Sequence, residues 1–228
     1  MTGIDWVKVR GDLDERGFAR TPRVLSPDAC EAIAGLYDDT ERFRSRIVMR
    51  RHAFGEGEYK YFAYPLPDPV QRLRETAYPE LAPLANRWAE QLGWQNRFPG
   101  SHAAYLDECH AAGQTRPTPL VLKYSEGGYN RLHQDLYGDL HFPVQMAVLL
   151  SDPASFEGGQ FVLTETRARM QNRAEAISLG QGDAVFFAVN QRPVRSARGY
   201  SRATMRHGVS TLHSGSRMTL GVIFHDAR

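Results

Sequence analysis

Three side chains that can bind a metal ion occur in two short segments of this chain. His133 and Asp135 stand two residues apart, and His207 follows 72 residues after Asp135. Two imidazoles and one carboxylate can occupy one face of a divalent iron and leave three positions open for other ligands. Arg217, ten residues after His207, could hold the carboxylate of a co-substrate that fills two of those positions. This combination of residues indicates an oxygenase.

The context of the His-x-Asp triplet strengthens this interpretation, since the triplet alone is a weak signal. It follows a predicted turn at residues 127–130 and stands just before a predicted strand. Side chains two residues apart on an extended segment point to the same side, so His133 and Asp135 can reach one ion.

The third ligand has rivals in His213 and, less favoured, His225. A strand, turn and strand over residues 209–219 would bring Arg217 back beside His207. No arginine follows the other two histidines at a comparable distance. We therefore prefer His207.

Length and composition indicate one ordinary globular domain. The 228 residues are enough for a full core, and 42% of them are hydrophobic. No apolar run approaches the roughly 20 residues needed to span a bilayer. The segment from Met1 to Trp6 lacks the features of a signal peptide, and two cysteines give no disulfide framework. We expect a cytoplasmic protein.

The positive charge consists almost entirely of arginine, which supplies 25 of the 28 basic residues. The net charge of +2 is too small to imply a nucleic-acid partner by itself. Codon bias from a GC-rich genome would explain the arginines. Recognition of phosphate or carboxylate would explain them too, because the arginine fork suits these groups better than lysine does.

The first 116 residues are expected to form a mainly helical layer. Ser26-Pro27-Asp28 is typical of a helix start, because the hydroxyl can cap the first turn and proline suits its first position. Pro79 and Gly93 mark expected helix ends. The predicted helices cover residues 26–37, 68–76 and 81–92. Residues 52–67, rich in glycine and aromatic residues, are predicted to form a loop or hairpin.

After about Pro117 the pattern becomes that of β-strands. Short runs rich in Val, Leu, Phe and Thr recur between turn residues. They cover residues 120–124, 144–150, 160–164, 184–188 and 218–224. This spacing predicts a double-sheet sandwich or barrel, with the helical layer packed on it.

The metal-binding set resembles that of the non-haem iron, 2-oxoglutarate-dependent dioxygenases. The resemblance implies Fe(II), 2-oxoglutarate and O2 as cofactor and co-substrates. It implies that Fe(II) is bound by three residues: His133, Asp135 and His207. Arg217 would pair with the distal carboxylate of 2-oxoglutarate, helped by Tyr124 and Thr219. Related halogenases replace the carboxylate ligand with a small residue, so Asp135 favours hydroxylation.

The same resemblance implies a fold. That family has a double-stranded β-helix, or jelly roll, so we expect an α+β fold with a mainly β core and N-terminal helices packed against it. Residues 1–228 would form a single domain. Its parts would be the helical layer, 1–116, and the catalytic core, 117–228.

A closer resemblance extends over nearly the whole chain. It is to a bacterial oxygenase family associated with oxidative demethylation of damaged nucleic acid, in the manner of AlkB-type repair enzymes. The segments that carry it are 57–62, 116–120, 130–138, 158–161, 206–210 and 224–227. Gln160 departs from the glutamate expected after the paired glycines, which affects no metal ligand.

Two kinds of residue could serve a nucleic-acid substrate. Arginines could meet a phosphate backbone, although a charge run is usually a solvated face. They are Arg42, Arg44, Arg46, Arg50 and Arg51, and Arg192, Arg195, Arg198, Arg202 and Arg206. Aromatic side chains could stack on a flipped base, although in strands they are usually core. They are Tyr59, Tyr61, Phe62 and Tyr64.

Two other functions remain open. One is hydroxylation of a protein side chain or a small metabolite. The His207–Arg217 spacing favours it, because this spacing is at least as close to that of prolyl-hydroxylase-like enzymes as to that of AlkB-type enzymes. The other is a cupin-like module that holds a metal without turnover. Such a module would not convert 2-oxoglutarate to succinate. Between the two kinds of enzyme, salt-dependent binding of single-stranded DNA or RNA would favour the nucleic-acid substrate.

Overall fold

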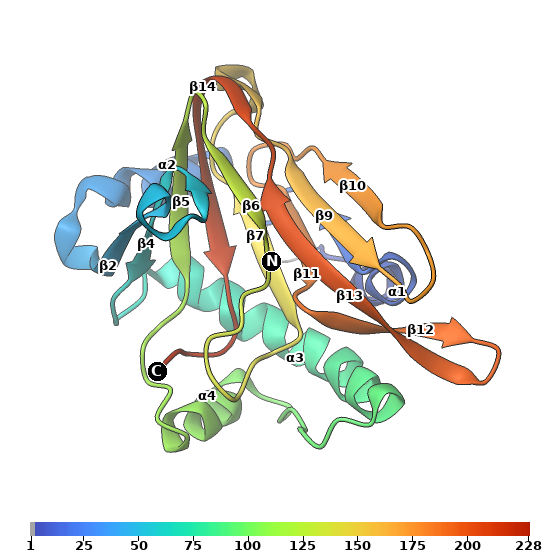
Figure 1. Cartoon of the computed structure of the whole chain (residues 1–228). Coiled ribbons are helices and arrows are strands. Elements are labelled where there is room, and N and C mark those ends of the chain that lie inside the picture. Colours follow the sequence, from blue (N-terminus) through green and yellow to red (C-terminus); the bar gives the residue numbers. More distant parts are fainter. Residues whose placement is uncertain (1–2) are drawn as a thin grey trace.

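Two antiparallel sheets face each other in the computed structural model, which describes residues 3–228 (Figure 1). The major sheet has the order β1 (Phe18–Thr21), β11 (Ala184–Ala188), β7 (Val144–Leu149), β14 (Leu212–Val222), β5 (Leu120–Ser125), β4 (Glu58–Phe62) and β2 (Phe43–Val48), and β8 (Phe156–Gly158) pairs with β14. The minor sheet has the order β10 (Arg173–Ile177), β9 (Phe161–Thr166), β13 (Gly199–Val209), β6 (Tyr129–His133) and β3 (Gly55–Glu56), and β12 (Gln191–Ser196) pairs with β13.

The predicted fold class, α+β with a mainly β core, is confirmed. Each of the five runs predicted as strands overlaps a strand of the structure, namely β5, β7, β9, β11 and β14. The first half of the chain is less helical than predicted, because it supplies β1 to β4 as well as the helices. These strands extend the sheets formed by the second half, so the boundary at residue 116 does not separate helices from strands.

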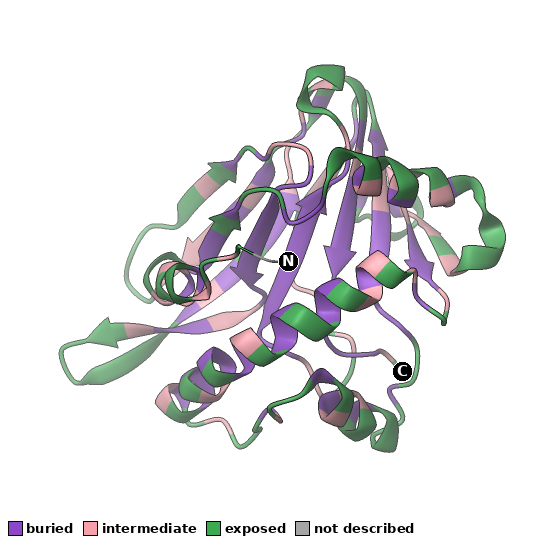
Figure 2. Cartoon of the chain, turned by 180° about the vertical axis from the view of Figure 1, so that it is seen from behind, coloured by how far each residue is buried: buried purple, intermediate pink, exposed green. Residues whose placement is uncertain are grey.

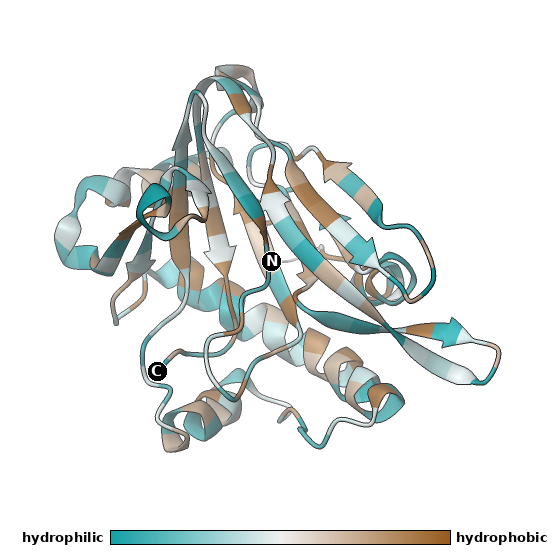
Figure 3. Cartoon of the chain, viewed as in Figure 1, coloured by the Kyte–Doolittle hydropathy of each residue, from teal (hydrophilic) through white to brown (hydrophobic). Residues whose placement is uncertain are grey.

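The major sheet is covered on both sides, and the minor sheet on one. Every residue of β7 and β11 is buried, which the apolar sequence of β11 and the almost entirely apolar sequence of β7 reflect. Seen from behind, helix α3 (Asp68–Leu92) crosses the major sheet (Figure 2). In the minor sheet, β6 and β10 are mostly exposed or half-buried. Accordingly β13 carries both hydrophobic and hydrophilic residues along its length (Figure 3).

Helix α3 corrects the prediction of two helices separated at Pro79, because it runs unbroken through Pro79 and Pro83. A proline inside a helix costs about 3 kcal/mol, since it lacks an N–H group and its ring crowds the preceding turn. Both prolines lie on the exposed side of α3, where the carbonyl groups left without a partner can bind water. The opposite side buries an apolar stripe that ends near Trp88, and this burial outweighs the cost.

Three shorter helices complete the helical part. Helix α2 (Pro27–Gly35) begins as predicted, with the Ser26 hydroxyl accepting from the Ala29 N–H, and a 3-10 turn continues it to Asp38. Helices α1 (Trp6–Arg16) and α4 (His102–Ala111) were not predicted, although Asp5 and Ser101 cap their first turns. No helix within residues 3–228 is long and apolar enough to cross a membrane. Met1 and Thr2, part of the segment inspected for a signal peptide, lie outside the described residues.

Residues 52–67 are held in place by both sheets. Strand β3 pairs with β6 of the minor sheet, and β4 lies between β5 and β2 of the major sheet. The predicted loop or hairpin is therefore half correct, since β4 and β2 form an antiparallel pair joined by a 3-10 turn and β3.

A buried carboxylate fastens helices α3 and α4 to the end of the major sheet. Asp226 Oδ1 accepts from Arg74 Nη2 at 3.0 Å, and Oδ2 lies 2.9 Å from both His110 Nε2 and Tyr64 Oη. The side chains of Asp226 and Arg74 are fully buried. Burial acts to raise the pKa of Asp226, but the charge of Arg74 and these hydrogen bonds outweigh it and lower that pKa. The pair is ionised and has no access to solvent.

Replacing Asp226 by alanine should lower the free energy of unfolding by roughly 3–5 kcal/mol, because it leaves the buried Arg74 cation without a counter-charge. The matched control is Asp139→Ala, which removes an ion pair to Arg228 in which both side chains are more than half exposed. Such a pair contributes less than about 1 kcal/mol. Urea denaturation followed by circular dichroism measures both. Equal losses in the two variants would contradict a structural role for the Asp226–Arg74 pair.

Candidate metal centre and adjoining pocket

Pairing between β6 and β13 brings the two predicted histidine ligands together. His133, the last residue of β6, is the ladder partner of His207 on β13, and their ring centroids lie 4.2 Å apart. Gly208 allows this close pairing, since a Cβ atom there would lie 2.6 Å from the Asn130 carbonyl oxygen. Asp135 follows β6 by two residues and turns its side chain to the same side.

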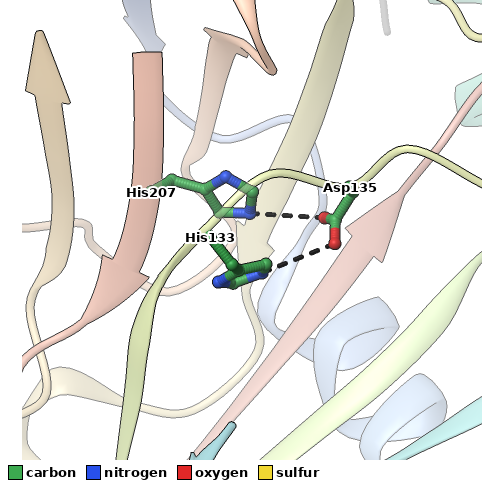
Figure 4. A group of neighbouring side chains, drawn as sticks. All are labelled: His133, Asp135 and His207. Atoms are coloured by element: carbon green, nitrogen blue, oxygen red, sulfur yellow. Dashed lines mark ion pairs between the residues drawn. The ribbon is translucent and has the colours of Figure 1, made fainter. Parts of the chain in front are cut away.

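The three side chains converge on one point (Figure 4). His133 Nε2 lies 3.4 Å from Asp135 Oδ1, and His207 Nε2 lies 3.3 Å from Asp135 Oδ2. One potential ligand atom from each residue lies within 4.8 Å of the other two. Two imidazole nitrogens and a carboxylate oxygen are a donor set suited to a divalent transition metal.

The carboxylate of Asp135 gives the cluster a negative charge. Burial acts to raise the pKa of Asp135, but hydrogen bonds with both histidines hold it well below its usual value. Burial lowers the pKa of His207 and favours its neutral form, whereas the hydrogen bond and charge of Asp135 raise the pKa of His133. His133 Nδ1 lies 2.7 Å from the Arg131 carbonyl oxygen, so a proton on Nδ1 leaves a lone pair on Nε2. That lone pair faces the Asp135 carboxylate, an arrangement that a metal ion between them would stabilise.

Two neighbouring side chains fix the His-x-Asp segment. The Tyr137 hydroxyl donates to Asp135 Oδ1 at 2.7 Å. Gln134 Nε2 donates to the Met205 carbonyl oxygen at 2.8 Å and to Asn190 Oδ1 at 2.9 Å, which ties the segment to β13. These roles were not predicted. The alternation of 133, 135 and 137 could have placed Tyr137 on the ligand side, but nothing in the sequence indicates the partners of Gln134.

The rival histidines lie elsewhere. His213 is exposed on β14, and His225 is buried with its Nδ1 accepting from the Phe142 N–H at 3.2 Å. Within the described residues, one group of three potential metal ligands meets in space, and it consists of His133, Asp135 and His207.

Beside these three residues a cavity of about 380 Å³ extends between the sheets, and the predicted co-substrate residues line it. Arg217 on β14 is the ladder partner of Tyr124 on β5, and Thr219 follows two residues later on the same side. Arg217 lies on the major sheet, which faces the sheet that carries His207. The predicted hairpin would have placed the two residues side by side in one sheet. The two-residue link after Val209 crosses between the sheets, so β13 and β14 do not pair with each other.

The end of the cavity at Arg217 is polar, buried and unsatisfied. Arg217 is only 3% exposed, and burial lowers its pKa. No carboxylate in residues 3–228 lies within 4.0 Å of its guanidinium nitrogens. Arg217 Nη1, Tyr124 Oη and Thr219 Oγ1 are buried without a hydrogen-bond partner from the described chain. Buried polar groups are normally paired, and a buried cation needs an anion. The pocket can therefore hold the carboxylate of a small molecule.

Of the four aromatic residues considered for base stacking, Tyr59 lines the cavity and the others do not. Tyr61 is 7% exposed, beneath the Arg44 guanidinium, and Phe62 stacks on Phe43 in the core. Tyr64 contacts Asp226. The mouth instead carries Phe54 and Leu132, which are 46% and 47% exposed.

The two arginine runs differ in how far carboxylates neutralise them. Arg42, Arg46 and Arg50 form ion pairs with Asp39, Glu58 and Glu56. Arg192 is buried and paired with Glu165, so it cannot contact a phosphate backbone as considered from the sequence. The four arginines after Arg192 in that run are exposed: Arg195, Arg198, Arg202 and Arg206.

Comparison with known proteins adds a family match. Residues 57–227 match the family Oxygenase-NA, described as an oxygenase catalysing oxidative methylation of damaged DNA. The chain is 48% identical over 167 residues to the uncharacterized protein Rv2227 of Mycobacterium tuberculosis (strain H37Rv), which covers 73% of this chain and 72% of the relative. The same values hold for the uncharacterized protein MT2286 of strain CDC 1551.

Solved structures share the fold at low sequence identity. A Pseudomonas putida prolyl-4-hydroxylase superposes with a TM-score of 0.57 and 16% identity, covering 98% of this chain and 99% of the other. An oxidoreductase of the 2OG-Fe(II) oxygenase family from Burkholderia pseudomallei gives 0.54 and 14%, covering 99% and 94%. These likenesses confirm the predicted jelly-roll fold.

The hydrogen bond from Tyr137 to Asp135 should support metal binding, because partners of ligand side chains orient them. Tyr137→Phe should weaken the affinity for Co²⁺ about tenfold to a hundredfold. Tyr59→Phe is the matched control, since Tyr59 lines the same cavity without a hydrogen bond to Asp135. Titration of the Co²⁺ absorption bands measures both. Unchanged affinity in Tyr137→Phe would show that Asp135 does not need this contact.

Proposed function

The chain belongs to the Oxygenase-NA family of oxygenases, and from this premise we propose that it is an Fe(II)- and 2-oxoglutarate-dependent dioxygenase that hydroxylates a C–H bond. One observation carries the proposal. A cavity with two imidazoles and a carboxylate at its wall has at its end a buried arginine that finds no counter-charge among residues 3–228. Together the two features suit a ferrous ion and an acidic co-substrate.

The proposed iron ligands are His133, Asp135 and His207. Their donor atoms already lie within 4.8 Å of one another, and the donor set leaves coordination positions open for co-substrate and O2. Neutral imidazoles and an ionised carboxylate are the forms that ligate, which is what the pKa directions of His207 and Asp135 favour.

The proposed 2-oxoglutarate contacts are Arg217, Tyr124 and Thr219. A guanidinium can donate two parallel hydrogen bonds to a carboxylate, and the two hydroxyl groups can add one each. All three groups have buried atoms that lack a hydrogen-bond partner in the part of the chain that the structure describes, so a carboxylate there would satisfy them together. O2 is the third reactant.

Bound Fe(II) and 2-oxoglutarate supply the oxygen chemistry, in which 2-oxoglutarate loses CO2 to give succinate and one oxygen atom enters a substrate C–H bond. The chain orients these groups and keeps water out. Tyr137 and Gln134 fix the segment that carries Asp135. Apolar walls, including Phe161 and Phe187, shield His207 from solvent.

Alkylated nucleic acid is the substrate that we propose first, on the strength of the family description. The mouth of the cavity combines the exposed apolar groups of Phe54 and Leu132 with the cation of Arg131. A flat base could lie against the first two, and its phosphate could meet the third. Hydroxylation of an N-methyl group gives an N-hydroxymethyl group, which releases formaldehyde and leaves the N–H form. The net reaction is demethylation.

A hydroxylase of a protein side chain or small metabolite is the second candidate. The apolar rim of Phe54 and Leu132 would suit an aliphatic group as well as a base. A metal-holding module without turnover is a weaker third. Such a module has no use for Arg217, whose burial without an anion is costly.

We also propose that residues 1–228 act as one catalytic domain. Strands β1 to β4 from the first half extend the same sheets that carry the site. We also propose a cytoplasmic location. Both cysteines, Cys30 and Cys109, are free buried thiols, and a reducing compartment keeps thiols in this form.

Succinate formation by the iron-loaded enzyme tests the function. We expect N-methylated single-stranded oligonucleotides to stimulate it strongly, with an equal amount of formaldehyde, and His133→Ala to abolish both. Slow succinate formation that oligonucleotides do not stimulate would support the oxygenase activity but contradict the nucleic-acid substrate, and it would favour a protein or metabolite substrate instead. No iron-dependent succinate under any condition would refute the proposed chemistry.

Arg217→Ala should raise the KM for 2-oxoglutarate about tenfold to a hundredfold, because hydrogen bonds between charged groups contribute about 1.5–3 kcal/mol. Arg131→Ala is the matched control, since it removes a guanidinium from the mouth of the same cavity. Succinate formation over a range of 2-oxoglutarate concentrations gives both values. A normal KM in Arg217→Ala would remove Arg217 from the co-substrate site.

A further inference from the structure

The hairpin of β12 and β13 projects from the body of the molecule (Figure 1). Its two strands pair from Gln191 opposite Thr204 to Ser196 opposite Gly199 at the tip. The tip residues 195–200 are all exposed, including Tyr200 at 42%. The Arg195 guanidinium lies 5.9 Å from the centre of the Tyr200 ring. Arginine and an exposed aromatic ring therefore stand side by side at the tip.

This hairpin has a net positive charge that the described residues do not neutralise at its exposed arginines. From Ala184 to His225 the sequence contains no aspartate or glutamate, although 26 residues of the chain are acidic. Arg195, Arg198, Arg202 and Arg206 form no ion pair with any residue from 3 to 228. Arg192, the buried arginine at the base, is the one that Glu165 neutralises. Basic segments without acidic residues can serve as interaction surfaces for nucleic acid.

Strand β13 connects this tip directly to the metal centre. His207 lies on β13, seven residues after Tyr200, which corresponds to about 23 Å at 3.3 Å per residue. Arg202 and Arg206 are exposed on the strand between them, and Arg202 also donates to the Leu92 carbonyl oxygen at 3.3 Å. The positive residues thus follow β13 from the tip toward the metal centre, with Arg202 and Arg206 on the outer face of the minor sheet, opposite to the face that carries His207.

We propose that the hairpin tip and the outer face of β13, through Arg195, Arg198, Tyr200, Arg202 and Arg206, dock the single strand that flanks the reacting nucleotide. The proposal rests on the proposed function, and it names the surface that would hold the strand. Single strands bind where basic side chains meet phosphates and aromatic rings stack on bases. Charge complementarity selects this partner, because this surface offers four guanidinium groups and no carboxylate.

Binding of an unmodified, fluorescently labelled 20-nucleotide single strand, as DNA and as RNA, tests the surface by anisotropy. Arg195→Ala/Arg198→Ala should weaken binding about three- to thirtyfold. It should also reduce the slope of log K against log salt by about 1.4, since each lost phosphate contact accounts for about 0.7. Tyr200→Ala should weaken binding about fivefold to a hundredfold, and Tyr200→Trp should restore it. All these residues are exposed, so folding should be unaffected.

Arg72→Ala is the matched control. Arg72 is exposed on α3 and, within the described residues, takes part in no ion pair, so its loss should leave both affinity and salt slope unchanged. A length series adds a second readout. The span of about 23 Å corresponds to roughly seven stacked nucleotides at 3.4 Å each. Oligonucleotides extending past this length should bind more tightly to the wild type but not to the double variant.

The outcomes separate the two proposals. If the wild type binds and the hairpin variants bind equally well, the docking surface is wrong and a nucleic-acid substrate remains. If the wild type binds no single strand in a salt-dependent way, both the docking surface and the nucleic-acid substrate are wrong, while succinate formation still reports the oxygenase. Competition by poly-glutamate as effective as that by the oligonucleotide would also overturn the proposal, because it would show attraction to negative charge alone.

Discussion

The register between β6 and β13 is the constraint on which the rest of the site depends. It sets His133 against His207, and it turns both imidazoles into the space between the sheets. A shift by one residue would point one imidazole to the opposite face, because side chains alternate along a strand. Asp135 gains its position from the same register. Contacts of Gln134 with Met205 and Asn190 hold the segment that carries Asp135, so this segment depends on neighbours from two other parts of the chain.

The second requirement is a charge that folding leaves uncompensated. Removing Arg217 from water costs several kcal/mol, and the described chain supplies no anion in return. Burial of the major sheet, in which β7 and β11 have no exposed residue, contributes the stabilisation that offsets this desolvation. A carboxylate that enters later finds the guanidinium already desolvated and oriented. Binding strength is therefore built into the folded protein before any ligand arrives.

The sequence allowed the chemistry to be predicted better than the geometry. The three residues His133, Asp135 and His207 could be chosen from the strand and turn context of the His-x-Asp triplet and from the position of Arg217 after His207. Pro79 misled, because its cost depends on whether it faces solvent, and only the packed helix determines that. Arg217 was placed in a hairpin, since the residues of a two-residue link do not reveal whether the chain turns back or crosses to the facing sheet.

Contacts with distant residues were the least predictable part. Tyr137 and Gln134 hold the ligand segment through partners set by tertiary structure, and Arg192 looked like its exposed neighbours until Glu165 was found beside it. The close approach of Gly208 to the Asn130 carbonyl oxygen extends this lesson to mutational tolerance. A residue with no chemistry of its own is as restricted as a ligand, because any side chain there would separate the two histidine strands. Natural variation at position 208 would thus report on the spacing of the metal ligands while leaving every ligand in place.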